Sequence, residues 1–317
     1  DLSGMEFCTA YALAPEWGVH TKGRMLQWGS FYDEHGRPFT TQRGLSGRQD
    51  AQRALTRGER VFTRLDRAPE HIRQTMRDAQ PNYFLPLDKA GIDPFTTAYP
   101  VRMVYEGSVR GTGGLRLLGP DCATTVPGLY AAGDAATREL ITGSLSGGGS
   151  RNGSWAIASG TFAGRGAADF SRTRRVHAAT APPDRPSRSG APTVEEVVAV
   201  AQSHVLPPQR SYLKSAERLH ESADVLETVW RDIADGLAPV PARDVYKQRQ
   251  AVAMVAAARW ITAASLARPE TRGVHRREDL PEAEHRYEHR ILVGGLDELW
   301  TTPDPVAPQL ISSEAVA

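Results

Sequence analysis

Residues 127–134 read PGLYAAGD, a short apolar run that ends at a Gly-Asp pair. Such a run favours a short strand that ends in a tight corner. At a corner of this kind, glycine lets a ligand lie against the main chain, and the side chain of Asp134 can accept hydrogen bonds from ligand hydroxyl groups. Gly-Asp pairs are also common in plain turns, so Gly133 and Asp134 gain a functional interpretation only through their surroundings.

The sequence upstream of this corner predicts a mixture of strands and helices. Residues 30–39 place a polar, Gly-containing turn between two aromatic-rich runs, which predicts a hairpin. Helices are expected over residues 48–65 and 69–78, followed by a loop marked by Pro86, Pro94 and Pro100. Glycine is dense from residue 110 to 165, and residues 155–168 predict a helix of small residues.

The sequence downstream of the corner predicts a helical domain. Residues 170–192 carry Pro182, Pro183, Pro186 and Pro192 among small polar residues, which is typical of a linker. Thr193 and Glu196 have the spacing of a capping box at the start of a helix. Apolar residues at helical spacing continue over 226–237, and a longer helix is expected over 244–268.

Composition and charge exclude several classes of protein. The chain has 317 residues and a formal net charge of +1, from 38 basic and 37 acidic residues, so it lacks the electrostatic footprint of a nucleic-acid binder. Two cysteines, Cys8 and Cys122, are too few for a disulfide framework or a Cys-ligated iron–sulfur cluster. The apolar stretch 251–267 is rich in alanine and interrupted by Arg259, which favours a buried or amphipathic helix over a membrane span. With no leader and a first residue other than Met, the chain is expected to be cytoplasmic, or peripheral to a membrane, and to lack its natural beginning.

Several segments carry a resemblance to a known family, beginning with the corner itself and a segment near the C-terminus. Residues 127–134 resemble the PGLYAAGE segment of succinate dehydrogenase and fumarate reductase flavoproteins, and adenylylsulfate reductase flavoproteins and L-aspartate oxidases are similar there. Residues 270–282, ETRGVHRREDLPE, resemble that family's ESRGAHxREDYPER signature. The resemblance implies an FAD-dependent oxidoreductase in which Gly133 and Asp134 contact the FAD, with Asp134 at the ribityl chain. Arg272, His275 and Asp279 are expected to dock the helical domain on the flavin domain.

The fold class that follows is α/β plus all-α. The resemblance implies a partial FAD-binding domain with an α+β capping domain, followed by a C-terminal helical bundle domain. The expected limits are 1–105 for the capping domain, 106–170 for the returning segment of the FAD-binding domain, 171–192 for the linker and 193–317 for the helical domain.

Two arginines are expected at the reacting centre. Residues 47–55, GRQDAQRAL, resemble the family's PRDxVSxAI helix start, which implies that Arg48 transfers the proton. Residues 150–167 align without gaps with the family's NRLGGNSLLDxxVFGRxA stretch, although residues 153–156 replace most of its GGNS. This alignment implies that Arg151 binds the substrate anion. The residues predicted to contact FAD around Arg151 are Gly149, Ser150, Gly153 and Ser154.

The chain departs from the family at two substrate-binding histidines. Tyr11 stands in place of the histidine of the family's MEFxQFHPTG segment, and the histidine of AHYTMGG is also absent. Glu106 or Arg110 could take over, and the RGTGG run of residues 110–114 is similar to the adenylylsulfate reductase branch. The substrate is therefore expected to be a small anion, with dicarboxylates, adenylylsulfate and an amino acid such as aspartate as the alternatives.

The nucleotide-binding part of the family pattern is missing. No strand followed by GxGxxG occurs, because the runs at Gly111 and Gly147 break at Arg116 and Asn152. The partners implied are therefore a missing N-terminal FAD-binding segment and a separate ferredoxin-like iron–sulfur protein that exchanges electrons with the flavin. The alternative is a split or inactive fragment that binds a partner and holds no FAD of its own; a purely helical scaffold fits the glycine-rich middle poorly.

Overall fold

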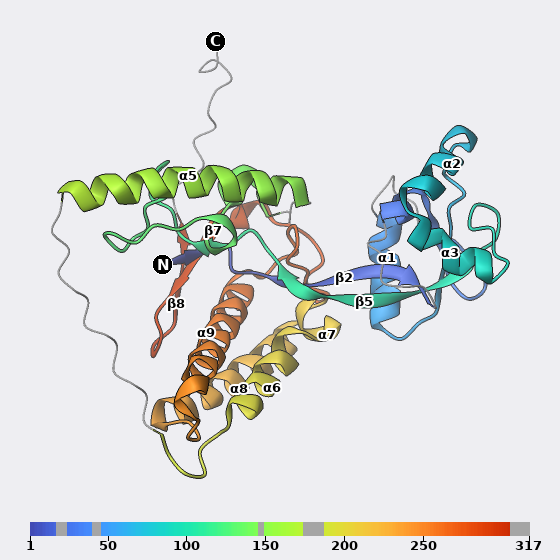
Figure 1. Ribbon diagram of the computed structural model, residues 1–317. Helices are drawn as coiled ribbons and strands as arrows, with labels where there is room; N and C mark the ends of the chain where they lie inside the picture. Colours follow the sequence, from blue (N-terminus) through green and yellow to red (C-terminus); the bar gives the residue numbers. More distant parts are fainter. Residues whose placement is uncertain (17–23, 40–45, 145–148, 174–186, 305–317) are drawn as a thin grey trace. The chain divides into compact units, whose positions relative to one another are not determined.

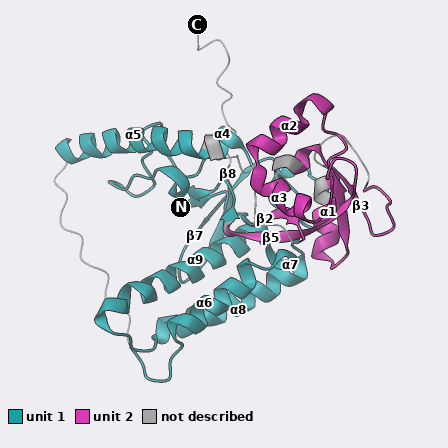
Figure 2. Cartoon of the chain, turned by 45° about the vertical axis from the view of Figure 1, so that its right-hand side comes forward, with its two compact units in different colours: residues 1–9, 109–317 teal, residues 10–108 magenta. Residues whose placement is uncertain are grey.

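A computed structural model describes residues 1–16, 24–39, 46–144, 149–173 and 187–304 (Figure 1). The chain divides into two compact units, shown in different colours in Figure 2. Unit 2 comprises residues 10–108, and unit 1 comprises residues 1–9 together with 109–317. The finer domain limits expected from the sequence stay predictions, and residues 174–186 of the expected linker lie outside the described residues.

Unit 2 is built on a four-stranded sheet with the strand order β2-β5-β4-β3. Antiparallel pairing places Phe31 opposite Thr63, and Val61 opposite Val101. The elements of this part of the chain are β2 (Cys8–Pro15), η1 (Arg24–Trp28), β3 (Ser30–Tyr32), α1 (Ser46–Thr56), β4 (Val61–Arg64), α2 (Glu70–Ala79), α3 (Pro81–Lys89) and β5 (Tyr99–Arg110).

The structure confirms the predicted hairpin and the helix expected over 69–78, which is α2, and it corrects two other local predictions in unit 2. Tyr32 bridges Pro38, and the Phe39 amide donates to the Phe31 carbonyl at 3.0 Å, which confirms the hairpin. The helix expected over 48–65 ends at Thr56, because Gly58 adopts a φ of 83° and residues 61–64 form β4.

The expected loop around Pro86 is a helix, α3, with Pro81 in its first turn. Tyr83, Phe84 and Leu87 are all buried in the core of unit 2. Their spacing puts them on one face of the helix, so apolar burial outweighs the single hydrogen bond lost at Pro86.

Unit 1 begins with a strand that pairs with segments far along the chain. The sheet has the order β6-β1-β7-β8, and Leu2 lies opposite Leu115 on one side and Val293 on the other. The first nine residues therefore belong with unit 1. The elements are β1 (Leu2–Ser3), β6 (Gly114–Leu115), η2 (Gly133–Ala135), α4 (Glu139–Thr142), α5 (Gly149–Thr173), β7 (Arg290–Gly294) and β8 (Trp300–Asp304).

The apolar run before the Gly-Asp corner does not form the expected strand. Residues 126–132 contribute one isolated bridge, Ala123 to Tyr130, and the chain enters the 3-10 turn η2 at Gly133. The corner itself is present, and α5 extends beyond both ends of the helix predicted over 155–168.

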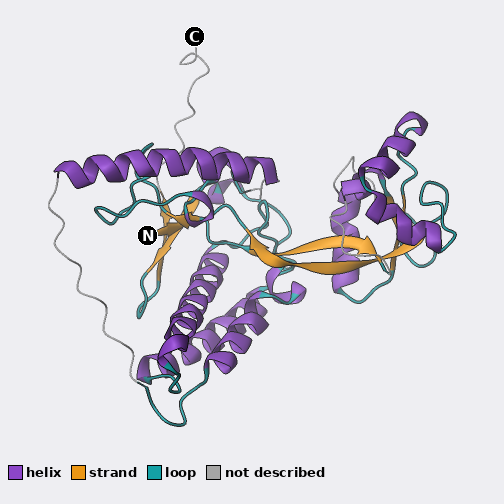
Figure 3. Cartoon of the chain, viewed as in Figure 1, coloured by secondary structure: helices purple, strands orange, loops and turns teal. Residues whose placement is uncertain are grey.

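The remaining part of unit 1 is mainly helical, as Figure 3 shows. Its elements are α6 (Val194–Val205), α7 (Pro208–Ser211), α8 (Ala216–Asp235), η3 (Ala242–Asp244), α9 (Val245–Ala267) and η4 (His285–Tyr287). The Thr193 hydroxyl accepts from the Glu196 amide at 3.2 Å, and the Glu196 carboxylate accepts from the Thr193 amide at 2.8 Å, which confirms the capping box. Trp230, Ile233 and Val255 lie in the shared core of α6, α8 and α9.

Helix α9 and the turn before it, Ala242–Ala267, are long and apolar enough to cross a membrane by length and composition. In unit 1 this helix packs against α6, α8 and β7, and Arg259 on it is buried beside Glu227. A core helix of a helical domain has the same properties.

Candidate functional site

The Gly133–Asp134 corner is held in place by two side chains of α5. The Gly133 amide donates to the Ser159 hydroxyl at 2.9 Å, and the Trp155 indole donates to the Gly133 carbonyl at 2.9 Å. Gly133 adopts a φ of 61°, a conformation that favours glycine. Both backbone groups of the glycine are therefore satisfied by α5, and the corner has a fixed geometry.

The carboxylate of Asp134 projects into solvent from this corner. Its side chain is 84% exposed, and Oδ1 accepts a hydrogen bond at 2.7 Å from Nη1 of Arg138, whose side chain is only 6% exposed. An exposed carboxylate with one oxygen engaged by a buried arginine can still accept hydrogen bonds from a ligand hydroxyl.

Arg138 also reaches the glycine-rich run of residues 110–114. Its Nη2 donates to the Gly111 carbonyl at 3.0 Å, and its backbone amide donates to the Thr112 carbonyl at 2.8 Å. One guanidinium group therefore joins the Asp134 corner to this run. Sequence reasoning did not single out Arg138; its signal was an arginine four residues after the Gly-Asp pair.

The glycines of this run serve close packing of the chain on itself. A Cβ on Gly111 would meet the ring of Phe7 at 2.5 Å, and one on Gly113 would collide with the Gly4 carbonyl. Gly114 packs in the same way on the backbone of Ala135. These positions need glycine because residues 3–7 and η2 lie against them. Arg110, the last residue of β5 and the residue before Gly111, is exposed.

A half-buried acid, Glu139, follows Arg138. Burial raises the pKa of Glu139 to about 7, hydrogen bonding from the Ser3 hydroxyl opposes this shift, and the negative charge of Glu6 adds to it. The Thr137 hydroxyl also donates to Glu139, at 3.3 Å. Glu139 therefore links β1 to the segment that carries Asp134 and Arg138.

The predicted FAD contacts at the start of α5 are described in part. Gly153 and Ser154 lie in the first turns of the helix and are exposed, and among the described atoms a Cβ on Gly153 would meet nothing within 4 Å. Gly149 and Ser150 begin the same helix, and what surrounds them lies outside the described part of the chain.

The side chains of Arg48 and Arg151 also lie outside the described residues, although their backbones belong to α1 and α5. Their predicted convergence on one flavin ring stays a prediction. Tyr11 and Glu106 belong to unit 2, where the Tyr11 ring lies 5.8 Å from the Tyr105 ring and Glu106 is half-buried on β5. Within unit 1, the structure brings together the 110–114 run, Gly133 and Asp134.

The segment 270–282 forms a buried polar network within unit 1. His275 Nε2 lies 3.0 Å from the Arg268 carbonyl, and its Nδ1 lies 3.2 Å from the Lys214 amine. Burial and the positive charge of Lys214 hold the pKa of His275 well below its ordinary value, so the imidazole is neutral. His275 therefore has a structural position, as a lone buried histidine more often does.

Arg272 and Asp279 stabilise the helical part of unit 1 itself. Arg272 makes two hydrogen bonds to the buried Glu270, at 2.7 and 3.1 Å. Asp279 accepts from the Ala216 amide at the start of α8, and hydrogen bonding from Arg277 lowers the pKa of Asp279 to about 2. The contact toward the glycine-rich part of the unit is made by the Val274 amide, which donates to the Ser144 carbonyl at 3.1 Å.

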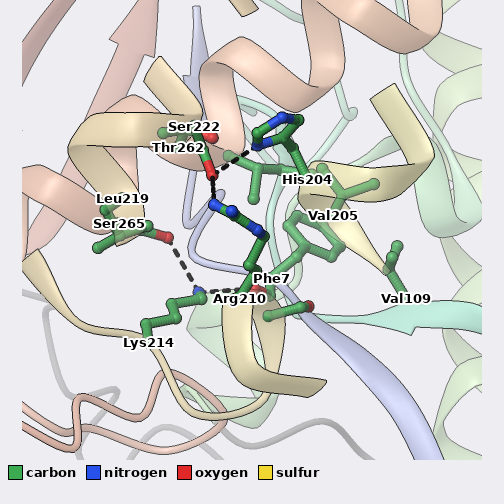
Figure 4. Close-up of a pocket in the computed structure, with 12 residues that line it drawn as sticks. Phe7, Val109, His204, Val205, Arg210, Lys214, Leu219, Ser222, Thr262 and Ser265 are labelled. Carbon is green, nitrogen blue, oxygen red and sulfur yellow. Dashed lines mark hydrogen bonds between the residues drawn. The ribbon is translucent and has the colours of Figure 1, made fainter. Parts of the chain in front are cut away.

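A small polar cavity lies between the helices α6 to α9 and the residues that flank them (Figure 4). Its volume is about 10 Å³, and its walls include His204, Arg210, Ser222 and Lys214. Ser222 lies 3.0 Å from His204 and 3.2 Å from Arg210. The volume suits one water molecule and excludes a substrate. Among the described residues, no group of three or more His, Cys, Asp or Glu side chains is arranged to hold a metal ion.

Comparison with known proteins identifies this architecture. Residues 211–300 match the family described as fumarate reductase flavoprotein C-term. Mycobacterium smegmatis Sdh1 in complex with UQ1 aligns with a TM-score of 0.62 and 22% identity over 99% of this chain and 58% of its own. Escherichia coli quinol fumarate reductase aligns with a TM-score of 0.65 and 16% identity over 97% and 60%. Adenylylsulfate reductase from Archaeoglobus fulgidus aligns with a TM-score of 0.65 and 12% identity over 96% and 60%. A comparison with curated proteins gave no match.

The fold is therefore that of the flavin-dependent oxidoreductases of the succinate dehydrogenase, fumarate reductase and adenylylsulfate reductase class. The family match covers residues 211–300, and the solved structures show that the rest of the chain shares this fold. The chain spans about 60% of the length of these solved relatives.

Proposed function

We propose that this chain is the capping, flavin-contacting and helical part of an FAD-dependent oxidoreductase that acts on a small anionic substrate. The observation that carries the proposal is the Gly133–Asp134 corner. It presents an exposed carboxylate at a fixed position within the fold of this family. In flavoproteins of this fold, bound FAD supplies the hydride acceptor and donor.

The chain's own residues fit one part of FAD. The Asp134 carboxylate is suited to accept hydrogen bonds from the ribityl hydroxyls. There is room beside Gly133, because a Cβ added to this glycine would meet only the Ala156 Cβ, at 3.8 Å, among the described atoms within 4 Å. Gly149, Ser150, Gly153 and Ser154, at the start of α5, would flank the flavin. The adenosine half would be held by the nucleotide-binding segment that the sequence pattern lacks.

The substrate is proposed to be an anion held by arginine. A guanidinium group matches the geometry of carboxylate and sulfate in bidentate contacts, so Arg151 would orient the substrate. Arg48 would move the proton, a role that rests on resemblance to the family. Tyr11, Glu106 and Arg110 would replace the two family histidines that are absent. A dicarboxylate, adenylylsulfate and an amino acid such as aspartate are the candidate substrates.

Electrons would be exchanged with a separate ferredoxin-like iron–sulfur protein. With two cysteines, this chain cannot supply the four thiolates that such a cluster generally needs. We place the reaction in the cytoplasm or at a membrane surface.

A second candidate function is that of a partner-binding subunit without FAD of its own. Large apolar side chains on α4 and α5 are exposed: Leu140 by 62%, Ile141 by 63% and Ile157 by 76%. Exposed apolar side chains of this size favour contact with another polypeptide. The proposed partner is a polypeptide that carries a nucleotide-binding segment, because these residues span about 60% of the length of the solved relatives.

A visible absorbance spectrum separates the two functions. We expect the longest natural form that contains these residues to purify with flavin absorbance and to turn over one member of a panel of fumarate, adenylylsulfate and aspartate. Turnover is seen as oxidation of a reduced dye with fumarate or adenylylsulfate, or as reduction of an oxidised dye with aspartate. A colourless protein that gains no flavin absorbance with added FAD would contradict the enzyme and favour the partner-binding subunit. Flavin binding without turnover on any member of the panel would contradict the proposed substrate class.

A further inference from the structure

Arg138 lies beside the Asp134 corner and makes hydrogen bonds to groups on two different segments. It is buried, and it contacts three groups: Asp134 Oδ1 at 2.7 Å, the Gly111 carbonyl at 3.0 Å and, through its backbone amide, the Thr112 carbonyl at 2.8 Å. Its Nε is also buried and makes no hydrogen bond in the described part of the chain. A guanidinium group placed in this way has few alternative positions, because rotation would break its buried bond to the Gly111 carbonyl.

Asp134, the exposed partner of Arg138, can adopt more side-chain conformations than the arginine can. Asp134 is 84% exposed, so without a partner its carboxylate would rotate among several staggered conformations. The bond to Arg138 fixes one oxygen and leaves most of the carboxylate surface accessible. Fixing a ligand-binding group before the ligand arrives removes part of the entropy that binding would otherwise lose.

We infer that Arg138 is a positioning residue that orients the Asp134 carboxylate toward the ribityl hydroxyls of FAD. This inference rests on the proposed function. Arg138 acts through Asp134 and does not contact the flavin in this arrangement. Its bond to Gly111 transmits the position of the 110–114 run to the same carboxylate, so the two segments form one preorganised half-site.

The experiment is a double-mutant cycle on the dissociation constant for FAD, in the longest natural form of the protein that contains this chain. FAD is removed and titrated back, with flavin fluorescence as the readout, for the unmodified protein, Arg138→Lys, Asp134→Ala and the double variant. Lysine keeps the charge, but it lacks the planar fork that reaches both Asp134 and Gly111. We expect Arg138→Lys to weaken FAD binding at least tenfold. In the Asp134→Ala background, the same change is expected to alter binding less than twofold.

A matched control separates positioning from simple loosening of the loop. Thr137→Val removes a buried hydroxyl that contacts the Thr112 carbonyl at 3.3 Å next to Arg138, without touching Asp134. We expect this variant to lower the melting temperature while the FAD dissociation constant changes less than twofold. If Arg138→Lys does not fold, Arg138→Gln takes its place in the same cycle.

The outcomes distinguish this inference from the proposed function. An unmodified protein that binds no FAD overturns the proposed function and this inference with it. FAD binding that is unaffected by Arg138→Lys, or weakened equally in the presence and absence of the Asp134 carboxylate, overturns the positioning role alone. Weakening that disappears in the Asp134→Ala background supports it.

Discussion

The amine of Lys214 lies 3.2 Å from Nδ1 of His275, and both side chains are buried. The same amine donates to the Phe7 carbonyl at 2.7 Å and to the Ser265 hydroxyl at 2.9 Å. Burial lowers the pKa of Lys214 to about 8, with the positive charges of Arg276 and Arg277 adding to the shift. One lysine therefore ties the N-terminal segment to α9 and to the segment that carries the family signature.

Lys214→Met should destabilise unit 1 strongly. Methionine fills a similar volume but leaves the Phe7 carbonyl, Ser265 and His275 without their donor, so we expect the free energy of unfolding to fall by about 2–4 kcal/mol. Urea denaturation at pH 7 measures this. Lys247→Met is the control, because Lys247 is exposed and pairs with Asp244, and its effect on the free energy of unfolding should be small beside that of Lys214→Met. Equal effects of the two substitutions would contradict the role of Lys214.

Glu139 should make stability depend on pH. Its folded pKa, raised by burial to about 7, lies above the ordinary value of 4.5, so the folded state favours the protonated acid. This contribution to stability is fully present below about pH 4.5 and is lost as the pH rises through 7. Between pH 5 and 8 the unmodified protein should lose about 1–3 kcal/mol more stability than Glu139→Gln, which stays neutral.

Chemical denaturation across this pH range tests the role of Glu139. Glu195→Gln, on an exposed position of α6, serves as the control and should keep the pH dependence of the unmodified protein. A Glu139→Gln variant with that same pH dependence would disprove the assignment.

The hydroxyl groups of Tyr83 and Tyr99 should show strong coupling in unit 2. They lie 2.5 Å apart in the core, and burial raises the pKa of both phenols, so both stay neutral. Tyr83→Phe and Tyr99→Phe each leave one buried hydroxyl without its partner, which costs about 1–2 kcal/mol. The double variant should lose less than the sum, because both polar groups are then removed.

Equilibrium unfolding of the four proteins gives the coupling free energy of the tyrosine pair. Tyr105→Phe, at an exposed position of β5, is the control and should change stability by less than about 0.5 kcal/mol. Additive losses in the double variant would mean that the two hydroxyls act independently.

Arg48→Ala should abolish turnover in the longest natural form of the protein while flavin stays bound. The expectation follows from the proposed proton transfer, and a general acid or base contributes about 10²–10⁴-fold in rate. Steady-state turnover and the flavin spectrum are measured together, with Arg57→Ala, at an exposed position just after α1, as the control. Loss of flavin from Arg48→Ala would show that the arginine is structural.

The sequence predicted correctly those helix ends that are decided by residues close together in the chain. The capping box at Thr193 starts α6, and Gly236 follows the end of α8, because a helix end is decided by the few residues around it. The same reasoning was wrong at Pro86, where burial of Tyr83 and Leu87 in the core of unit 2 keeps the chain helical. A proline signal is local, and the apolar contacts that outweigh it come from other elements.

The sequence by itself determined the Gly133–Asp134 corner, the helices of the C-terminal part and the family resemblance, since each depends on residues close together in the chain. Only the tertiary structure decided that Arg138, four residues from Asp134, also reaches Gly111, and that Lys214 meets His275, 61 residues away. A buried charge needs polar partners, and where those partners are far along the chain, the folded structure alone brings them within reach.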